Sequence, residues 1–360
     1  MKKVLLGTTA LVAAGVLAGG VQAAEKVKLG VGGYFNSAFG YVSEDDDDGE
    51  SGDRHYSTAL NQDNEIHFKG ETTLENGITV GARVELEGFT SGDQVDERWV
   101  YFRGGFGELR AGDEDDARKL KSYAAPTPTP NTFGVNSPFF TFNNLGPGQI
   151  TSSISTFRNL DNDAAKLIYF TPSFGGFQLA GSYAPDGQQD RTGFGTGSTD
   201  VSGFGQDWSI GADWSGEFAG LAIGAGGGYS AGTGKTAANE SSPWLAAGGV
   251  NIGFAGFTVG GSVLVGHGNQ GDEIDETDFD VGVTYTIDAV TVGAGWARAW
   301  FDDDATGNDD TFDQAQLGAS YALGPGISVD AMVGYFNYDA DVNDNSNSGW
   351  QTGIATAISF

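Results

Sequence analysis

The 360-residue chain contains no cysteine, so disulfide bonds do not stabilise it, and it has only three histidines, with no histidine metal motif around them. It also lacks, beyond its amino terminus, any run of about 18 apolar residues, which excludes a helical membrane protein. Basic residues are scarce: 18 lysines and arginines stand against 48 acids. This balance argues against nucleic acid as a partner.

The amino terminus has the composition of a secretory signal. Lys2 and Lys3 precede an apolar stretch over 4–17, and small residues lead to Ala23. This stretch is shorter than the roughly 20 residues of a membrane anchor, so we expect a signal peptide over 1–23, cleaved after Ala23. The mature chain, 24–360, then carries 16 basic residues against 48 acids, a formal charge of −32.

The remaining chain favours strands over helices. Its 59 glycines disfavour helix, and the segment 350–360 places large apolar or β-branched residues at even positions and small or polar residues at odd positions. A strand alternates its side chains with a period of two, and about 9 to 11 tilted residues cross a bilayer. The segment therefore has the pattern of a membrane strand whose even face contacts lipid.

The same alternation recurs along the chain. It is clearest in 65–74 and 78–87, which flank the turn at Asn76 and Gly77 and predict a hairpin. Counting weaker segments, the pattern predicts sixteen strands: 28–42, 65–74, 78–87, 99–103, 108–111, 166–171, 177–183, 208–214, 221–229, 244–252, 257–265, 279–287, 290–296, 315–323, 327–335 and 350–360. An even number is typical of bacterial membrane barrels.

The sequence thus predicts an all-β fold, a 16-stranded antiparallel transmembrane β-barrel. Short and long connections alternate, as they do in barrels with periplasmic turns and external loops, and tyrosines and tryptophans gather near strand ends. A soluble β-sandwich or propeller is the alternative. It is disfavoured because the face opposite the apolar one is too small and polar for a core.

One connection, 113–163, is far longer than the others. Loops of this length are usually functional or disordered. Its apolar residues, among them Phe133, Phe139, Phe140 and Phe142, argue against a solvated tail. We expect the loop to pack inside the barrel.

At this point the chain resembles the general bacterial porins, trimeric 16-stranded outer-membrane channels, and especially those of alphaproteobacteria. The resemblance covers the mature chain in pattern. It rests on the ordered segments 27–34, 68–77, 104–113 and 173–177 and on the terminal Phe360.

The resemblance implies that 113–163 is a third loop folded into the lumen, the constriction loop, whose acids face a basic cluster on the wall. The candidate acids are Asp113, Glu114, Asp115, Asp116, Asp161 and Asp163. The alternation places four candidate bases on the lumen face, Lys69, Arg83, Arg103 and Arg110, which we call the basic ladder. Arg98 has the lipid-facing phase and is included weakly. The family's Pro-Glu-Phe-Phe-Gly-Gly turn is replaced by 136–140, which leaves open which loop residue comes closest to the wall.

The expected function is passive diffusion of small hydrophilic solutes and ions through an outer-membrane porin of a Gram-negative bacterium. The charge of −32 predicts modest cation selectivity. A solute-specific outer-membrane channel is the alternative, and an outer-membrane barrel hydrolase using His67 is a more remote one. The expected partners are outer-membrane lipid, lipopolysaccharide, two further copies in a homotrimer, and the barrel-assembly machinery, which in the family reads a terminal aromatic such as Phe360.

No cofactor is expected, although acidic loops could gather divalent cations such as calcium. Asp302, Asp304, Thr306, Gly307 and Asp313 approximate the spacing of a helix-flanked calcium loop. No helices are predicted beside them, so solvated loops are favoured. These residues form a weak metal candidate.

Overall fold

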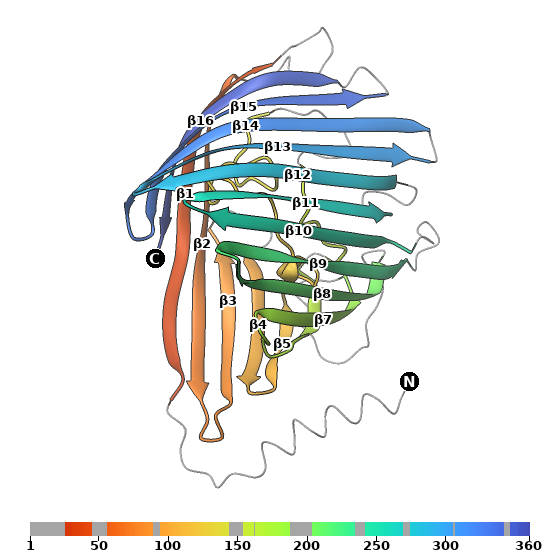
Figure 1. The fold of residues 1–360 in the computed structure, drawn as a ribbon. Helices are drawn as coiled ribbons and strands as arrows, with labels where there is room; N and C mark the ends of the chain where they lie inside the picture. Colours follow the sequence, from red (N-terminus) through yellow and green to blue (C-terminus); the bar gives the residue numbers. More distant parts are fainter. Residues whose placement is uncertain are drawn as a thin grey trace.

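The computed structural model describes residues 26–44, 56–88, 94–143, 154–161, 163–187, 204–234, 242–268, 274–304, 307–341 and 346–360, which form a closed barrel (Figure 1). Its sixteen strands are β1 (Lys28–Glu44), β2 (Thr58–Thr73), β3 (Thr79–Glu87), β4 (Val95–Gly104), β5 (Gly107–Asp113), β6 (Ala165–Phe170), β7 (Phe177–Asp186), β8 (Phe204–Phe218), β9 (Leu221–Gly234), β10 (Trp244–Phe254), β11 (Phe257–His267), β12 (Ile274–Ile287), β13 (Val290–Asp303), β14 (Asn308–Gly324), β15 (Ile327–Ala340) and β16 (Asn347–Ser359). The predicted fold class and strand number are confirmed. The predicted signal peptide, 1–23, lies outside the described residues.

Every strand pairs antiparallel with its sequence neighbour, and β1 pairs with β16 to close the ring. The seam extends to the chain's last residue: Gly33 N–H donates to Phe360 O at 3.0 Å, and Phe360 N–H donates to Gly33 O at 3.1 Å. Closure leaves no open sheet edge, which is the condition for a sheet in lipid. No helix in the described part of the chain is long and apolar enough to cross a membrane.

The two faces of the strands differ as the alternation predicts. Large apolar side chains such as Ile354, Val263 and Leu317 are exposed on the outer face, where lipid would cover them. Several strands are longer than expected at one end: β2 starts at Thr58, and β13 and β14 continue through positions that the sequence assigned to an acidic loop. These ends are mostly polar, and their backbone hydrogen bonds continue the sheet beyond the apolar band.

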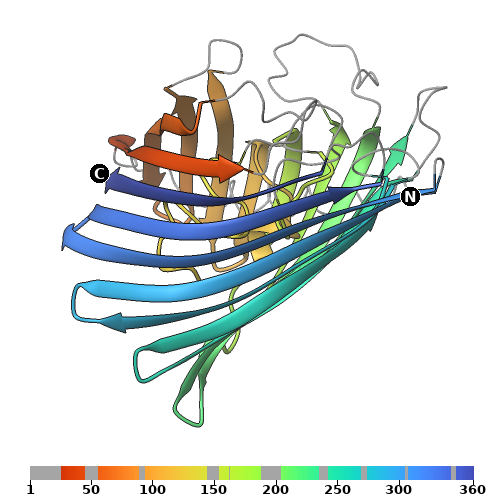
Figure 2. The same ribbon diagram turned by 90° about the horizontal axis from the view of Figure 1, so that it is seen from above.

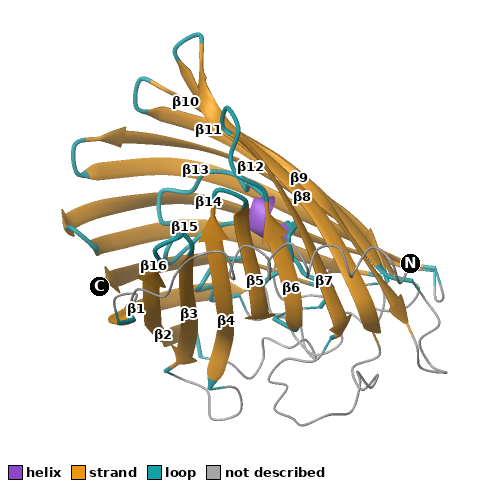
Figure 3. Ribbon diagram, turned by 90° about the horizontal axis from the view of Figure 1, so that it is seen from below, coloured by secondary structure: helices purple, strands orange, loops and turns teal. Residues whose placement is uncertain are grey.

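The connection between β5 and β6, residues 114–164, is here called the β5–β6 loop, and its described residues, 114–143, 154–161, 163 and 164, lie inside the barrel. Its short helical turn η2 (Lys119–Lys121) is enclosed by strands, and the rest of its described path crosses the interior (Figures 2 and 3). Its hydrogen bonds reach inward-facing groups on strands far along the chain: Asn251 Nδ2 to Ala124 O at 3.0 Å, Thr132 Oγ1 to Asp330 Oδ2 at 2.8 Å, and Phe142 N to Gln351 Oε1 at 2.9 Å. The loop therefore follows the wall from β6 around to β16 and leaves the wall of β2 to β5 facing open space.

An apolar cluster holds the far part of this loop. Five loop side chains are buried, Phe133, Val135, Phe140, Phe142 and Ile154, against inward rings from three strands, Phe301, Phe312 and Phe336. Burial of one such side chain is worth about 1.5 to 3 kcal/mol. The burial free energies of the five side chains add up to much more than the thermal energy that drives loop motion. We therefore expect the loop to be fixed.

Inward-facing glycines let the loop backbone approach the wall closely. A Cβ added at Gly226 would lie 2.2 Å from Lys121 O, one at Gly249 2.1 Å from Tyr123 O, and one at Gly282 2.5 Å from Pro126 O. These separations are shorter than any van der Waals contact. The three strands β9, β10 and β12 can hold the loop at this depth only because they carry no side chain there.

Replacing one of these glycines is expected to displace the loop. In Gly249→Ala the new methyl group meets the carbonyl oxygen of Tyr123, so we expect about 1 to 3 kcal/mol of destabilisation, which is usual for overpacking. Because the methyl group pushes the loop off the wall of β10 and toward the open passage, we also expect a smaller channel conductance. Thermal unfolding in detergent and single-channel recording measure the two effects. The matched control is Gly248→Ala, whose Cβ would face outward and lie 3.8 Å from its nearest neighbour, Gly226 O. Equal unfolding temperatures for the two variants would contradict the prediction.

Candidate functional site

The basic ladder lies on the open wall, on four consecutive strands. Lys69 of β2 is directly opposite Arg83 of β3, and Arg103 of β4 is directly opposite Glu108 of β5. Arg110 of β5 lies opposite the inward ring of Tyr101. The four bases thus share the inward phase, because directly opposed residues in a sheet point to the same face.

Each ladder base has an acid of the same wall beside it, which the sequence reasoning missed. Lys69 Nζ lies 3.3 Å from Glu71 Oε2, and Arg110 Nε lies 2.6 Å from Glu108 Oε1. Arg83 pairs with Glu85, and Arg103 lies 3.5 Å from Glu71 and 3.6 Å from Glu108. The signal was present, because three of the four bases have an acid two positions away on their own strand, and such residues share a face. The ladder is therefore an alternating arrangement of both signs.

Aromatic rings fill the spaces between these charges. Arg83 and Arg110 both lie over the ring of Trp99, at 5.3 and 5.4 Å from its centroid, and Arg110 also lies 4.8 Å from that of Phe170. Arg103 lies 5.5 Å from the ring of Tyr101. Cation–π contacts within about 6 Å hold a guanidinium in place. The ladder is thereby fixed as a rigid surface.

Asp113 departs from the sequence expectation. It is the last residue of β5, one position before the loop, and it has the outward phase. Its carboxylate accepts a hydrogen bond from Arg98 Nε at 2.8 Å, and Arg98 is the base that the sequence placed in the lipid-facing phase. The two residues thus pair at the strand ends on the outer face. A shift of one position along a strand reverses the face, so Asp113 does not point toward the lumen.

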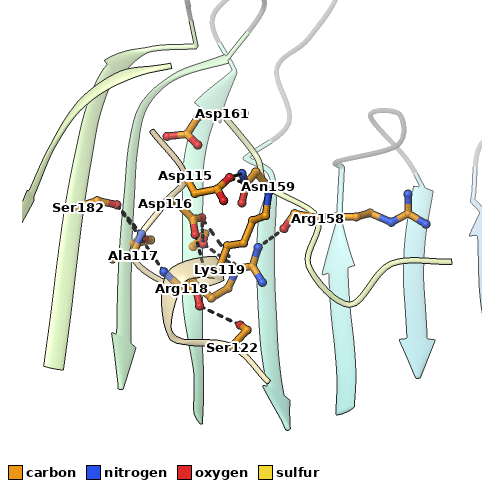
Figure 4. Close-up of polar contacts among 12 residues, drawn as sticks. Asp115, Asp116, Ala117, Arg118, Lys119, Ser122, Arg158, Asn159, Asp161 and Ser182 are labelled. Atoms are coloured by element: carbon orange, nitrogen blue, oxygen red, sulfur yellow. Dashed lines mark hydrogen bonds and ion pairs between the residues drawn. The ribbon is translucent and has the colours of Figure 1, made fainter. Parts of the chain in front are cut away.

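The other loop acids lie near the two ends of the β5–β6 loop, where Asp115, Asp116 and Asp161 are shown in Figure 4, and they contact both loop groups and wall residues. Glu114 does reach the ladder, at 2.6 Å from Arg110 Nη1. Asp115 instead accepts from Lys119 Nζ at 2.7 Å and from Asn159 Nδ2 at 2.6 Å. Asp116 accepts from the backbone N–H of Lys119 at 2.7 Å and from Ser230 Oγ at 2.5 Å, while Asp161 lies 3.4 Å from Lys166 Nζ. These four acids therefore do not form one row across from the ladder.

Asp163 closes a group of carboxylates at the loop's end. Its oxygens and those of Asp115 and Glu97 lie within 4.8 Å of one another. Burial, and then the nearby charge of Asp115, raises the pKa of Asp163 to about 7. Burial likewise raises the pKa of Glu114 and of Asp161 above the ordinary values, against the opposing effects of Arg110 and Lys166. Glu114, Asp161 and Asp163 are thus held in an environment that disfavours their charged forms.

Glu114 contacts Arg110, but the loop residues that share a cavity with Lys69 and Arg83 are uncharged. Phe139 packs edge-on against the ring of Tyr34 on β1, with 5.8 Å between the ring centroids. Within 136–140, Phe139 is therefore a residue that contacts the barrel wall. Phe139 and Asn131 line a cavity of about 540 Å³ together with Lys69 and Arg83. The open passage is thus bounded by a charged wall on one side and by neutral loop residues on the other.

The weak calcium candidate is not a loop of the proposed kind. Asp302 belongs to β13 and Asp313 to β14, and the two strands form a hairpin in which Asp302 is opposite Asp309. Asp313 lies opposite Arg298, with 3.7 Å between the carboxylate and Nε. Asp304 is in the turn, and Thr306 lies outside the described residues. Asp302 and Asp313 are therefore separated by several rungs and cannot share an ion.

Comparisons with known proteins agree with the barrel fold. A family model described as Gram-negative porin matches residues 7–341. The structure is similar to the outer-membrane channel DcaP of Acinetobacter baumannii (14% identity, 96% of this chain and 100% of that one, TM-score 0.63) and to an anion-selective porin from Comamonas acidovorans (14%, 93% and 100%, 0.61). It is also similar to the trimer form of OmpT of Vibrio cholerae (15%, 93% and 100%, 0.61). A search of curated sequences found no match.

Proposed function

Because the chain belongs to the Gram-negative porin family, and so forms a porin channel in the outer membrane of a Gram-negative bacterium, we propose that this channel passes small hydrophilic solutes passively and prefers cations. The family and fold favour a channel over an enzyme. We further propose a homotrimer, as in the trimer form of Vibrio cholerae OmpT, surrounded by outer-membrane lipid and lipopolysaccharide.

One observation supports the cation preference above the others: the basic ladder is outnumbered on its own wall. Its four bases share the inward face of β2 to β5 with eight acids, Asp63, Glu65, Glu71, Glu85, Glu87, Asp96, Glu97 and Glu108. Since each base has an acid within 4 Å, its field is cancelled locally, and the remaining charge is negative. The barrel fold itself does not decide the sign, because the similar Comamonas porin is described as anion-selective.

The test is the reversal potential of the purified protein in a planar bilayer across a KCl gradient. We expect a sign that reports preference for K⁺ over Cl⁻. A potential of the opposite sign would refute the cation proposal while leaving the channel itself intact.

The same measurement should depend on pH. Asp163, with a raised pKa of about 7, is mostly charged at pH 8 and mostly neutral at pH 6, so the preference for K⁺ is expected to weaken as pH falls between these values. At both pH values, Asp163→Asn should show the weak K⁺ preference that the wild type has at pH 6. Its preference should therefore change less between pH 8 and pH 6 than that of the wild type. The control is Asp275→Asn at the end of β12, whose carboxylate contacts His267. A full pH response in Asp163→Asn would exclude Asp163 as its source.

A further inference from the structure

His67 lies between two carboxylates on the open wall. Its Nε2 is 2.6 Å from Glu65 Oε2, on the same strand, and 3.1 Å from Glu85 Oε2, directly opposite on β3. The side chains of Glu65 and Glu85 are only 12% and 7% exposed, so they are held in place. The ligand atoms of the three residues all lie within 4.8 Å of one another.

The hydrogen bonds around the ring define where its proton is. Arg83 Nη2, which can only donate, lies 3.0 Å from His67 Nδ1. Nδ1 is therefore the acceptor, and the neutral ring carries its proton on Nε2, between the two carboxylates. Tyr34 Oη donates to Glu65 Oε1 at 2.6 Å and leaves Oε2 directed at the ring. Two anionic oxygens thus converge on one N–H.

This donor set differs from a cluster of carboxylates alone, because it combines an imidazole nitrogen with two oxygens. Zn²⁺ and related transition-metal ions bind such mixed sets at about 2.0 to 2.2 Å per ligand, whereas Ca²⁺ prefers six to eight oxygens. Ligands around a tetrahedral ion at those bond lengths lie roughly 3.4 Å apart. The separations from Nε2, 2.6 and 3.1 Å, are shorter than this, so an ion in place of the proton requires the two carboxylates to move outward by less than about 1 Å.

The site is open to the channel. His67 lines the cavity of about 540 Å³, together with Tyr34, Asn131 and Phe139, and its side chain is 21% exposed. An ion arriving through the lumen can reach Nε2, and the cavity leaves room for water to complete the coordination.

We propose that Glu65, His67 and Glu85 form a binding site for a divalent transition-metal ion, with Zn²⁺ as the representative. On binding, the ring proton moves from Nε2 to Nδ1, so the ring stays neutral. Arg83 then gives up its contact with Nδ1 and keeps its ion pair with Glu85. The bound ion adds two positive charges to the inward face of the open wall.

The site should make K⁺ conduction sensitive to zinc, and this consequence, unlike binding, rests on the proposed function. A fixed divalent charge beside the passage repels other cations. We therefore expect micromolar ZnCl₂ to reduce single-channel K⁺ current and EDTA to restore it.

Calorimetry of the purified, folded protein with ZnCl₂ tests the site directly. His67→Ala is expected to weaken Zn²⁺ binding by about tenfold or more, and Glu85→Gln to weaken it in the same direction. The matched control is His267→Ala, since His267 contacts a carboxylate, Asp275, at 2.6 Å, but on β11 and β12. Excess CaCl₂ is expected not to displace the zinc.

The possible results distinguish failure of the zinc site from failure of the proposed channel function. Unchanged zinc affinity in His67→Ala, or loss of binding in His267→Ala instead, would overturn the site. Displacement by calcium would also overturn it, because the imidazole would then not be a ligand. Binding lost in His67→Ala without any effect of zinc on wild-type current would support the site and contradict the proposed conduction route past it. Absence of current without zinc would instead refute the proposed function alone.

Discussion

Excising residues 123–156 and joining the ends with a short Gly-Ser linker is expected to raise single-channel conductance about threefold, since a barrel of sixteen strands otherwise leaves an open aqueous channel. The excision removes most of the β5–β6 loop that lies inside the barrel. It retains Arg118, whose guanidinium donates to the backbone carbonyl of Arg158, so the two cut ends already lie close together. The linker therefore need not span the lumen.

The excised variant must still be a closed barrel for this result to be informative. Far-UV circular dichroism and the mobility of the unheated protein in detergent gels provide that control. The inward rings of Phe301, Phe312 and Phe336 lose their cover, so some destabilisation is expected as well. A closed barrel with unchanged conductance would show that the loop does not limit the passage.

The second large effect is expected from Glu71→Gln combined with Glu108→Gln. Arg103 is 3.5 and 3.6 Å from these two carboxylates, which also lie beside Lys69 and Arg110. Removing both charges leaves the four ladder bases beside six inward acids, so the excess of acids over bases on this wall falls from four to two. We expect the reversal potential in a KCl gradient to shift toward Cl⁻, with about a fivefold fall in the permeability ratio of K⁺ to Cl⁻.

A variant with the same change of net charge far from the ladder provides the control. Asp302→Asn with Asp304→Asn removes two acids at the end of the β13–β14 hairpin. If this control shifts the reversal potential as much as the ladder variant does, selectivity depends on the overall charge of the protein and not on the ladder.

The strands were predictable because their signal is local. Alternation with a period of two gives both the strand and its two faces, so the inward phase of Lys69 and Arg83 followed from residues beside them. Boundaries were less predictable. In β2, and at the ends of β13 and β14 that face their connecting turn, polar residues continue the backbone hydrogen bonding of the sheet beyond the apolar band. There the sequence no longer alternates, so it does not distinguish strand from loop.

The path of the β5–β6 loop was predictable only in outline. Its apolar composition indicates that it packs inside, but its partners are distant in sequence: Thr132 bonds to Asp330, which is 198 positions away. Whether an acid such as Asp115 faces the wall or the loop's own Lys119 depends on that docking. Asp113 ends β5 and Glu114 begins the loop, so the two residues are adjacent. The carboxylate of Asp113 nevertheless lies on the outer face of the wall, whereas that of Glu114 lies on the inner face beside Arg110.

The pairing of β1 with β16 has a consequence for the order in which the barrel forms. The other rungs of the described strands join neighbours in sequence, so those hairpins can form early and independently. Tyr34 must instead find Ser359, 325 positions later, and closing so long a chain costs about 3 kcal/mol more in entropy than closing a turn of ten residues. We therefore expect the pairing of β1 with β16 to be the last and slowest step of barrel formation. A substitution that weakens this pair should delay barrel closure more than an equal weakening of any other strand pair.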